Sequence, residues 1–140
     1  MDVWFEDTAM GRYVAQNEAA FFERHLQYFD GQTVVQQGGQ WLRSSERMRS
    51  LYCRFWQRTA RPADAMAWES HSIDVLLMPH SHETAALMQV LHEASRVLKP
   101  EGRLVLTGFN PKSLWFFSKW FDGTCLPKKE HCLTLPALKK

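Results

Sequence analysis

Histidine and cysteine are the residue types in this sequence that most readily suggest metal chemistry, and their spacing argues against it. His80 and His82 form an HxH pair in a turn, and His92 follows ten residues later. Zinc sites combine histidines with cysteines or carboxylates at recognised spacings, and none stands at such a spacing here. Cys125 and Cys132 form a lone pair, which fits neither a complete zinc site nor a disulfide framework. The sequence therefore predicts free thiols and no metal site.

Asn110 lies in a Gly-Phe-Asn-Pro turn that directly follows the apolar segment RLVLT. An amide fixed by Pro111 at the end of a strand can donate and accept hydrogen bonds toward a substrate. It can equally cap a helix that begins at PKSLW, because Asn before a proline-led helix is an ordinary N-cap. Both interpretations of Asn110 are open.

The first part of the chain predicts a helix followed by a strand. Residues 10–29 form an amphipathic helix by their periodicity, and Glu18, Glu23 and Arg24 are expected on its polar side. The expected apolar stripe comprises Tyr13, Val14, Phe21, Phe22, Leu26 and Phe29. Asp30-Gly31 ends the helix, and QTVVQQGGQ predicts a short strand that breaks at Gly38-Gly39. A second strand is expected from Tyr52 to Trp56.

The clearest pattern is a strand, a helix and a strand in succession. IDVLLMPH contains an apolar run from Ile73 to Met78 that is typical of a buried parallel strand and is closed by Pro79. Asp74 inside this run is expected to be structural. Residues 83–102 carry apolar residues at helical spacing from Leu87 to Leu98, Pro100 and Gly102 supply the stop, and RLVLTG follows. A right-handed βαβ crossover places the two strands side by side. Ligands in such sheets bind at the carboxyl ends of the strands, here Gly38-Gly39, Pro79-His80 and 108–110.

Composition indicates one domain without special features. The chain has 140 residues, and 17 Lys and Arg oppose 15 Asp and Glu without a basic run, which argues against a nucleic-acid partner. Six Trp and nine Phe indicate aromatic packing in a core or an interface. No segment resembles a signal peptide or a membrane span, so we expect a cytoplasmic protein without a membrane partner.

Several motifs together resemble the class I S-adenosylmethionine-dependent methyltransferases. They are GRY…E in the first helix, SHSIDVLLMPH, VLHEASRVLKPEGRLVLTGFNP and SLW, and they point to bacterial methyltransferase-like proteins with a GFNP turn. The resemblance covers roughly Gly11–Trp115 and is most specific over Ile73–Pro111. It implies an abbreviated Rossmann-like α/β fold, with mostly parallel strands and helices on both faces. The whole chain, 1–140, would be a single domain with a helix at 10–29, a sheet core at 33–111 and a helical tail at 112–140.

The resemblance also implies S-adenosylmethionine as cofactor. The implied cofactor site comprises Gln37, Gly38, Gly39, Asp64, Met78, Pro79 and His80. The turn reads GG where the family has GxGxG, and no ribose-binding acid is evident. Asp64 is the carboxylate nearest to the family's adenine-binding acid.

His80 and Asn110 are the candidates for a catalytic role. His80 stands where the resemblance places a strand-end residue beside the methyl donor, so it could shape the pocket, act as a general base or simply cap the strand.

The family fold continues with an antiparallel strand pair where this chain stops, so we expect RLVLTG to lie at an open edge. The helical aromatic group at 115–121 would then pack or form a homodimer contact. Two functions follow: a methyltransferase whose methyl acceptor, a small molecule or a macromolecule, is unknown, or an inactive relative that acts as a binding or dimeric interaction module.

Overall fold

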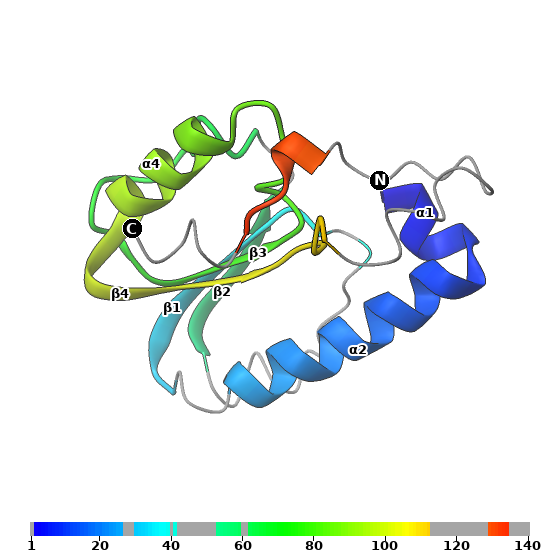
Figure 1. Cartoon of the computed structure of the whole chain (residues 1–140). Coiled ribbons are helices and arrows are strands. Elements are labelled where there is room, and N and C mark those ends of the chain that lie inside the picture. The colour runs from blue at the N-terminus through cyan, green and yellow to red at the C-terminus, as the bar shows by residue number, and fades with distance from the viewer. Residues whose placement is uncertain are drawn as a thin grey trace.

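A computed structural model describes residues 2–26, 30–39, 41, 53–59, 62–112 and 129–134. Figure 1 shows a sheet with helices on both of its faces. The elements are α1 Asp2–Asp7, α2 Ala9–Leu26, β1 Gln32–Gln37, β2 Cys53–Thr59, β3 Ile73–Pro79, α4 Leu87–Val97, β4 Leu98–Thr107 and the short 3₁₀ helix η1 Lys129–His131. The predicted strand at 52–56 is thus β2, displaced by a few residues.

The four described strands form one parallel sheet in the order β2-β1-β3-β4. The chain runs outward from β1 to β2, returns to the middle at β3, and then runs outward to β4 on the other side. Strand order therefore reverses between β1 and β3, and this switch point is where open α/β sheets bind ligands. The α/β class and the βαβ unit predicted from the sequence are confirmed.

Strands β1 and β3 are buried on both faces, because neighbouring residues of a strand point to opposite sides of the sheet. Val75 and Leu77 of β3 join a cluster that includes Phe5 and Phe22 from α1 and α2. Leu76 and Met78 join a second cluster against α4. In Figure 1, α2 and α4 accordingly lie on opposite sides of the sheet.

Helix α4 spans the part of 83–102 that carries the apolar residues at helical spacing. The Thr84 hydroxyl accepts a hydrogen bond from the Ala86 N–H, which forms a local turn before the helix begins at Leu87. The helix ends at Val97 because Leu98 is already extended. Its buried residues are Val90, Ala94 and Val97, which recur on one helical stripe.

Asp74 fastens the amino ends of three strands. Its Oδ2 accepts a hydrogen bond from Thr33 N–H of β1 at 2.8 Å, and its Oδ1 pairs with Lys99 Nζ of β4 at 2.9 Å. Burial alone would raise the pKa of Asp74, but the hydrogen bonds from Lys99 and Thr33 outweigh it and the pKa is lowered. The structural role expected for Asp74 is confirmed, and it lies at the edge of the sheet opposite the switch point.

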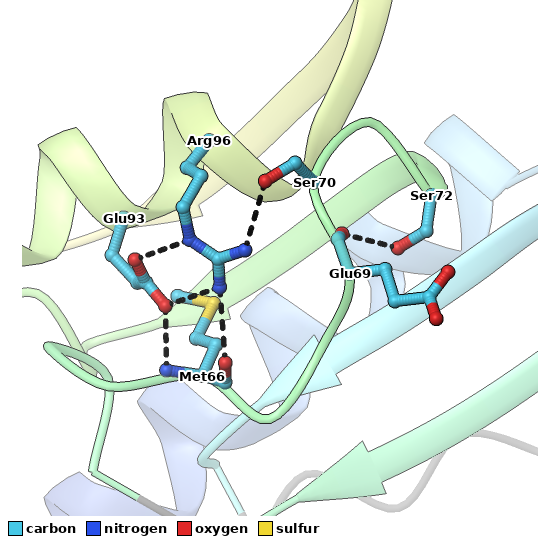
Figure 2. Close-up of polar contacts among 6 residues, drawn as sticks. All are labelled: Met66, Glu69, Ser70, Ser72, Glu93 and Arg96. Atoms are coloured by element: carbon cyan, nitrogen blue, oxygen red, sulfur yellow. Dashed lines mark hydrogen bonds and ion pairs between the residues drawn. The ribbon is translucent and has the colours of Figure 1, made fainter.

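The loop before β3 is held to α4 by Arg96. Figure 2 shows its guanidinium reaching the Glu93 carboxylate, the Met66 carbonyl and the Ser70 hydroxyl. Glu93 also accepts a hydrogen bond from the Met66 N–H at 2.9 Å. These contacts fix the chain between β2 and β3 on the α4 face of the sheet.

Several predictions concern residues beyond those described. Outside the described residues lie the aromatic group at 115–121, Cys125 and most of the expected tail helix. The end of the predicted first helix, at 27–29, also lies outside them. β4 is an edge strand of the sheet that the described strands form, as predicted, and a homodimer covering that edge stays a prediction. No helix within the described ranges is long and apolar enough to cross a membrane.

Two substitutions on α4 test its packing against the sheet. Val90 is 1% exposed and Met88, two residues earlier, is 72% exposed. Val90→Ala is expected to lower the free energy of unfolding by about 2 kcal/mol, because it removes two buried methyl groups and leaves a cavity. Met88→Ala should change it by less than about 0.5 kcal/mol. Urea denaturation of both variants checks this, and equal effects would contradict the placement of α4.

Candidate functional site

The turn after β1 contains two consecutive glycines in the left-handed region. Gly38 has a φ of 74° and Gly39 has a φ of 61°. Residues with a Cβ adopt this backbone conformation only at a cost in free energy. The Gly38 N–H donates to the Thr59 carbonyl at the end of β2, at 2.7 Å. The Gln36 amide donates to the carbonyl oxygens of Gly38 and Gly39 at 3.1 and 3.0 Å. The turn is therefore rigidly defined by its neighbours.

The same turn is joined to the end of β3. The Ser81 hydroxyl donates to the Gln37 carbonyl at 2.7 Å. A Cβ added to Gly39 would lie 2.2 Å from Pro79 Cγ, and one added to Gly38 would lie 2.9 Å from Ser81 Cβ. The glycines are thus required by the close approach of β1 and β3 at the switch point.

His80, immediately after β3, is held between two carboxylates. Its Nε2 lies 2.8 Å from Glu18 Oε1 of α2, and its Nδ1 lies 2.7 Å from Glu83 Oε2. The histidine is 5% exposed, and its backbone N–H donates to the Thr107 carbonyl at the end of β4. One side chain therefore connects α2 with the ends of β3 and β4.

Glu83 holds the Gly-Phe-Asn-Pro turn beside His80. Its Oε1 accepts the Phe109 N–H at 2.5 Å while its Oε2 accepts from His80. A Cβ added to Gly108 would lie 2.9 Å from His82 Nε2 and 3.0 Å from Glu83 Oε1. The residue before Phe109 therefore has to lack a side chain so that Glu83 can reach the backbone.

Aromatic rings cover the His80 cluster. The His80 ring centroid is 4.4 Å from that of Phe109, 5.0 Å from Phe5 and 6.1 Å from Trp41. Phe5 and Trp41 stack with centroids 3.8 Å apart. Helix α1, which carries Phe5, thus forms part of a roof over the strand ends.

A pocket of about 360 Å³ opens beside this roof. Its lining residues come from α1, α2 and the segment after β1, and they are Phe5, Glu6, Arg12, Ala15, Gln16 and Trp41. Its volume lies at the lower end of the range for small-molecule sites, about 300–1,000 Å³. Phe5 and Trp41 are shared between the pocket and the His80 cluster.

The two histidines at this edge have opposite electrostatics. Burial by itself would lower the pKa of His80, but the hydrogen bonds and charges of Glu18 and Glu83 raise it to about 9. Burial lowers the pKa of His82, and the charge of His80 adds to this effect against the attraction of Glu83. At neutral pH His80 is therefore an imidazolium that donates from both nitrogens, which suits a structural cap and not a general base, and His82 is neutral.

The structure brings together five of the residues expected to bind a cofactor. Gln37, Gly38, Gly39, Pro79 and His80 meet at the carboxyl ends of β1 and β3.

The other candidates lie elsewhere or face another way. The Met78 side chain belongs to the α4-facing cluster. Asp64 is exposed on a turn that follows β2. Asn110 is exposed, and its Oδ1 accepts the Lys112 N–H at 3.0 Å, so its side chain caps the chain that follows it.

The sequence analysis missed Glu18 and Glu83. Glu18 was expected on the polar side of its helix, which is wrong, because its side chain is 13% exposed and directed at His80. Conversely, Tyr13 was expected on the apolar stripe and is 63% exposed. The available signal for Glu83 was its position three residues after His80, a spacing that allows local pairing.

Comparison with known proteins now identifies the fold. Residues 34–106, slightly more than half of the chain, match the family described as methyltransferase domain. The chain belongs to this methyltransferase domain family. The class I resemblance found in the sequence is thereby confirmed, whereas the narrower assignment to members with a GFNP turn stays a prediction. None of the curated proteins matches the chain.

Solved structures show the same fold at low identity. The YcgJ protein from Bacillus subtilis superposes with a TM-score of 0.52 and 14% identity over 65% of this chain and 50% of its own. A SAM-dependent methyltransferase from Thermotoga maritima superposes with a TM-score of 0.52 and 18% identity, over 91% of this chain and 74% of its own. This methyltransferase domain thus spans half of the length of YcgJ.

Two of the residues expected to bind a cofactor can be reached from solvent. Gly38 is half-exposed at the switch point, so its backbone can be approached closely by a ligand. Asp64 offers an exposed carboxylate on the turn after the neighbouring strand β2.

The His80 cluster makes stability depend on pH. The folded-state pKa of about 9 exceeds the ordinary value of 6.5, so the stabilisation is complete below pH 6.5 and is lost as the pH rises through 9. We expect the free energy of unfolding to fall by about 3 kcal/mol across this window.

Urea denaturation of the wild type and of His80→Gln, at pH 6.5 and 9.5, measures this loss. The variant should lack it. The lowered pKa of His82 affects stability only below pH 6.5, outside the pH window of His80. A pH profile of stability in the wild type that runs parallel to that of His80→Gln would contradict the arrangement.

Alanine substitutions at two glycines separate backbone strain from crowding. Gly31 has φ of 69° with nothing within 4 Å of an added Cβ, whereas the Cβ at Gly39 would meet Pro79. Gly31→Ala should cost about 1 kcal/mol of stability from the left-handed backbone. Gly39→Ala should cost about 1–3 kcal/mol more because of the clash. Thermal unfolding compares the two, and equal losses would show that β1 and β3 do not approach as described.

Proposed function

We propose that this protein is an S-adenosylmethionine-dependent methyltransferase of unknown acceptor. The observation that carries the proposal is the Gly38-Gly39 turn at the switch point of a methyltransferase-family sheet. Such a turn lets a ligand approach the backbone at the strand end where cofactors of α/β sheets bind. The chain covers 50% of the length of YcgJ, so the activity of a whole methyltransferase is a proposal for this chain.

Local charge supports a cationic cofactor. The cluster of Glu18, His80 and Glu83 contains two carboxylates against one imidazolium. The remaining negative charge favours a sulfonium group at this edge of the sheet, where the aromatic roof lowers the local dielectric. Methyl transfer itself requires chiefly that the donor and the acceptor are held in line and shielded from water.

An inactive relative that works through its surface is the second candidate. It is favoured by the internal use of the polar groups of the turn, since the Gly38 N–H and the carbonyls of both glycines already have partners. A binding module of this kind would keep the fold without the affinity for the cofactor. We also propose a homodimer, which the edge position of β4 among the described strands suggests, and a cytoplasmic location.

Calorimetric titration with S-adenosylmethionine and S-adenosylhomocysteine tests the first candidate. We propose that Asp64 holds the adenosine part of the cofactor. We therefore expect micromolar binding by the wild type and a loss of about tenfold in Asp64→Asn, because a hydrogen bond to a charged group is removed. Asp30→Asn is the matched control, since Asp30 is also an exposed turn carboxylate but lies before β1.

No binding at millimolar ligand by the folded protein would favour the inactive relative. Equal binding by the two variants would remove Asp64 from the site. Gly38→Val is unsuitable for this purpose, because its Cβ would crowd Ser81 and disturb the fold.

A further inference from the structure

Glu18 is the charged residue through which α2 reaches the strand ends. It lies in the middle of an 18-residue helix, and the His80 nitrogen that it contacts belongs to a residue 62 positions later in the chain. Its side chain is 13% exposed and that of His80 is 3% exposed, so the pair is shielded from solvent. An ion pair in such surroundings is strongly directional and is little weakened by salt.

Glu18 shares helix α2 with three of the residues that line the pocket. Ala15 is three residues before Glu18, so the two lie on the same face of α2. Ala15 lines the pocket together with Arg12 and Gln16 of the same helix. Because α1 packs on α2 and carries Phe5, a displacement of α2 would also displace the roof over His80.

Glu18 is costly for a purely structural contact. Its Oε2 is buried without a hydrogen-bond partner among the residues that the structure describes. An unsatisfied carboxylate oxygen opposes folding, and an apolar residue of similar size would avoid this cost. The charge therefore specifies one position of α2 where apolar packing alone would allow several.

We propose that Glu18 is a positioning residue of the methyl-transfer site, which fixes α1 and α2 over the carboxyl ends of β1 and β3 through His80. This inference rests on the proposed function, since it assigns the roof to the site where the cofactor is expected. Glu83 holds the opposite side of the His80 ring and the Phe109 N–H, so it keeps His80 in place when Glu18 is altered. His82, the other titratable neighbour, stays neutral.

Glu18→Gln tests the proposal, with Glu23→Gln as its matched control. Glu23 lies on the same helix and is half-exposed, and its position five residues after Glu18 places it on another face of α2. We expect Glu18→Gln to lower the pKa of His80, measured by NMR of its ring protons. It should also increase hydrogen exchange of the α1 and α2 amides and weaken S-adenosylhomocysteine binding about tenfold, the effect of one lost charge-assisted hydrogen bond. Glu23→Gln should change none of the three.

The outcomes separate this inference from the proposed function. If Glu18→Gln lowers the pKa of His80 but exchanges and binds like the wild type, the pair is a structural contact only and the inference is wrong. If the wild type binds no S-adenosylhomocysteine, the proposed function is wrong and the assigned role falls with it. If Glu18→Gln does not fold, Glu18→Asp, which keeps the charge but shortens the reach, replaces it with the same expectations and the same contradicting result.

Discussion

The arrangement of the site depends on one buried imidazolium. His80 lies where β3 ends, and its two ring nitrogens bind carboxylates from different parts of the chain, Glu18 in α2 and Glu83 in the following turn. Removing either carboxylate would leave the buried charge of His80 incompletely compensated. The loss of stability would exceed the net stabilisation that the ion pair provides. The positions of the N-terminal helices and of the Gly-Phe-Asn-Pro turn are therefore coupled through one ring.

The two edges of the sheet are organised for different tasks. At the amino edge, Asp74 joins Thr33 and Lys99 in a partly exposed contact that fastens strands together. At the carboxyl edge, left-handed glycines, a buried charged cluster and aromatic rings are concentrated around the switch point. His80 at this edge has a φ of 57°, which is a strained conformation for a residue with a Cβ. Strain and buried charge lower stability, and their concentration at one edge is typical of a functional site.

Local pattern was sufficient to predict the elements but not the contacts of the site. Burial on a sheet face determines the apolar run Ile73–Met78 and the stripe of Val90, Ala94 and Val97, and periodicity reports such burial directly. Glu18 was misplaced because a helical wheel shows which residues share a face, whereas whether a charge on that face is buried depends on a partner 62 residues away. Gly39 was recognised as part of a turn. The clash that an added Cβ at Gly39 would make with Pro79 is visible only once β1 and β3 are side by side.

The separation between Glu18 and His80 also has a consequence for how the chain folds. During synthesis α1 and α2 emerge before β3 exists, so the aromatic side of these helices has no sheet to cover when it first forms. Contacts between distant segments form late because the intervening chain must first be ordered. The βαβ unit from Ile73 to Thr107 is compact in sequence, so its contacts close shorter loops than the Glu18–His80 contact does. The N-terminal helices would thus dock last, and until then Phe5 and Phe22 would be exposed to chaperones or to aggregation.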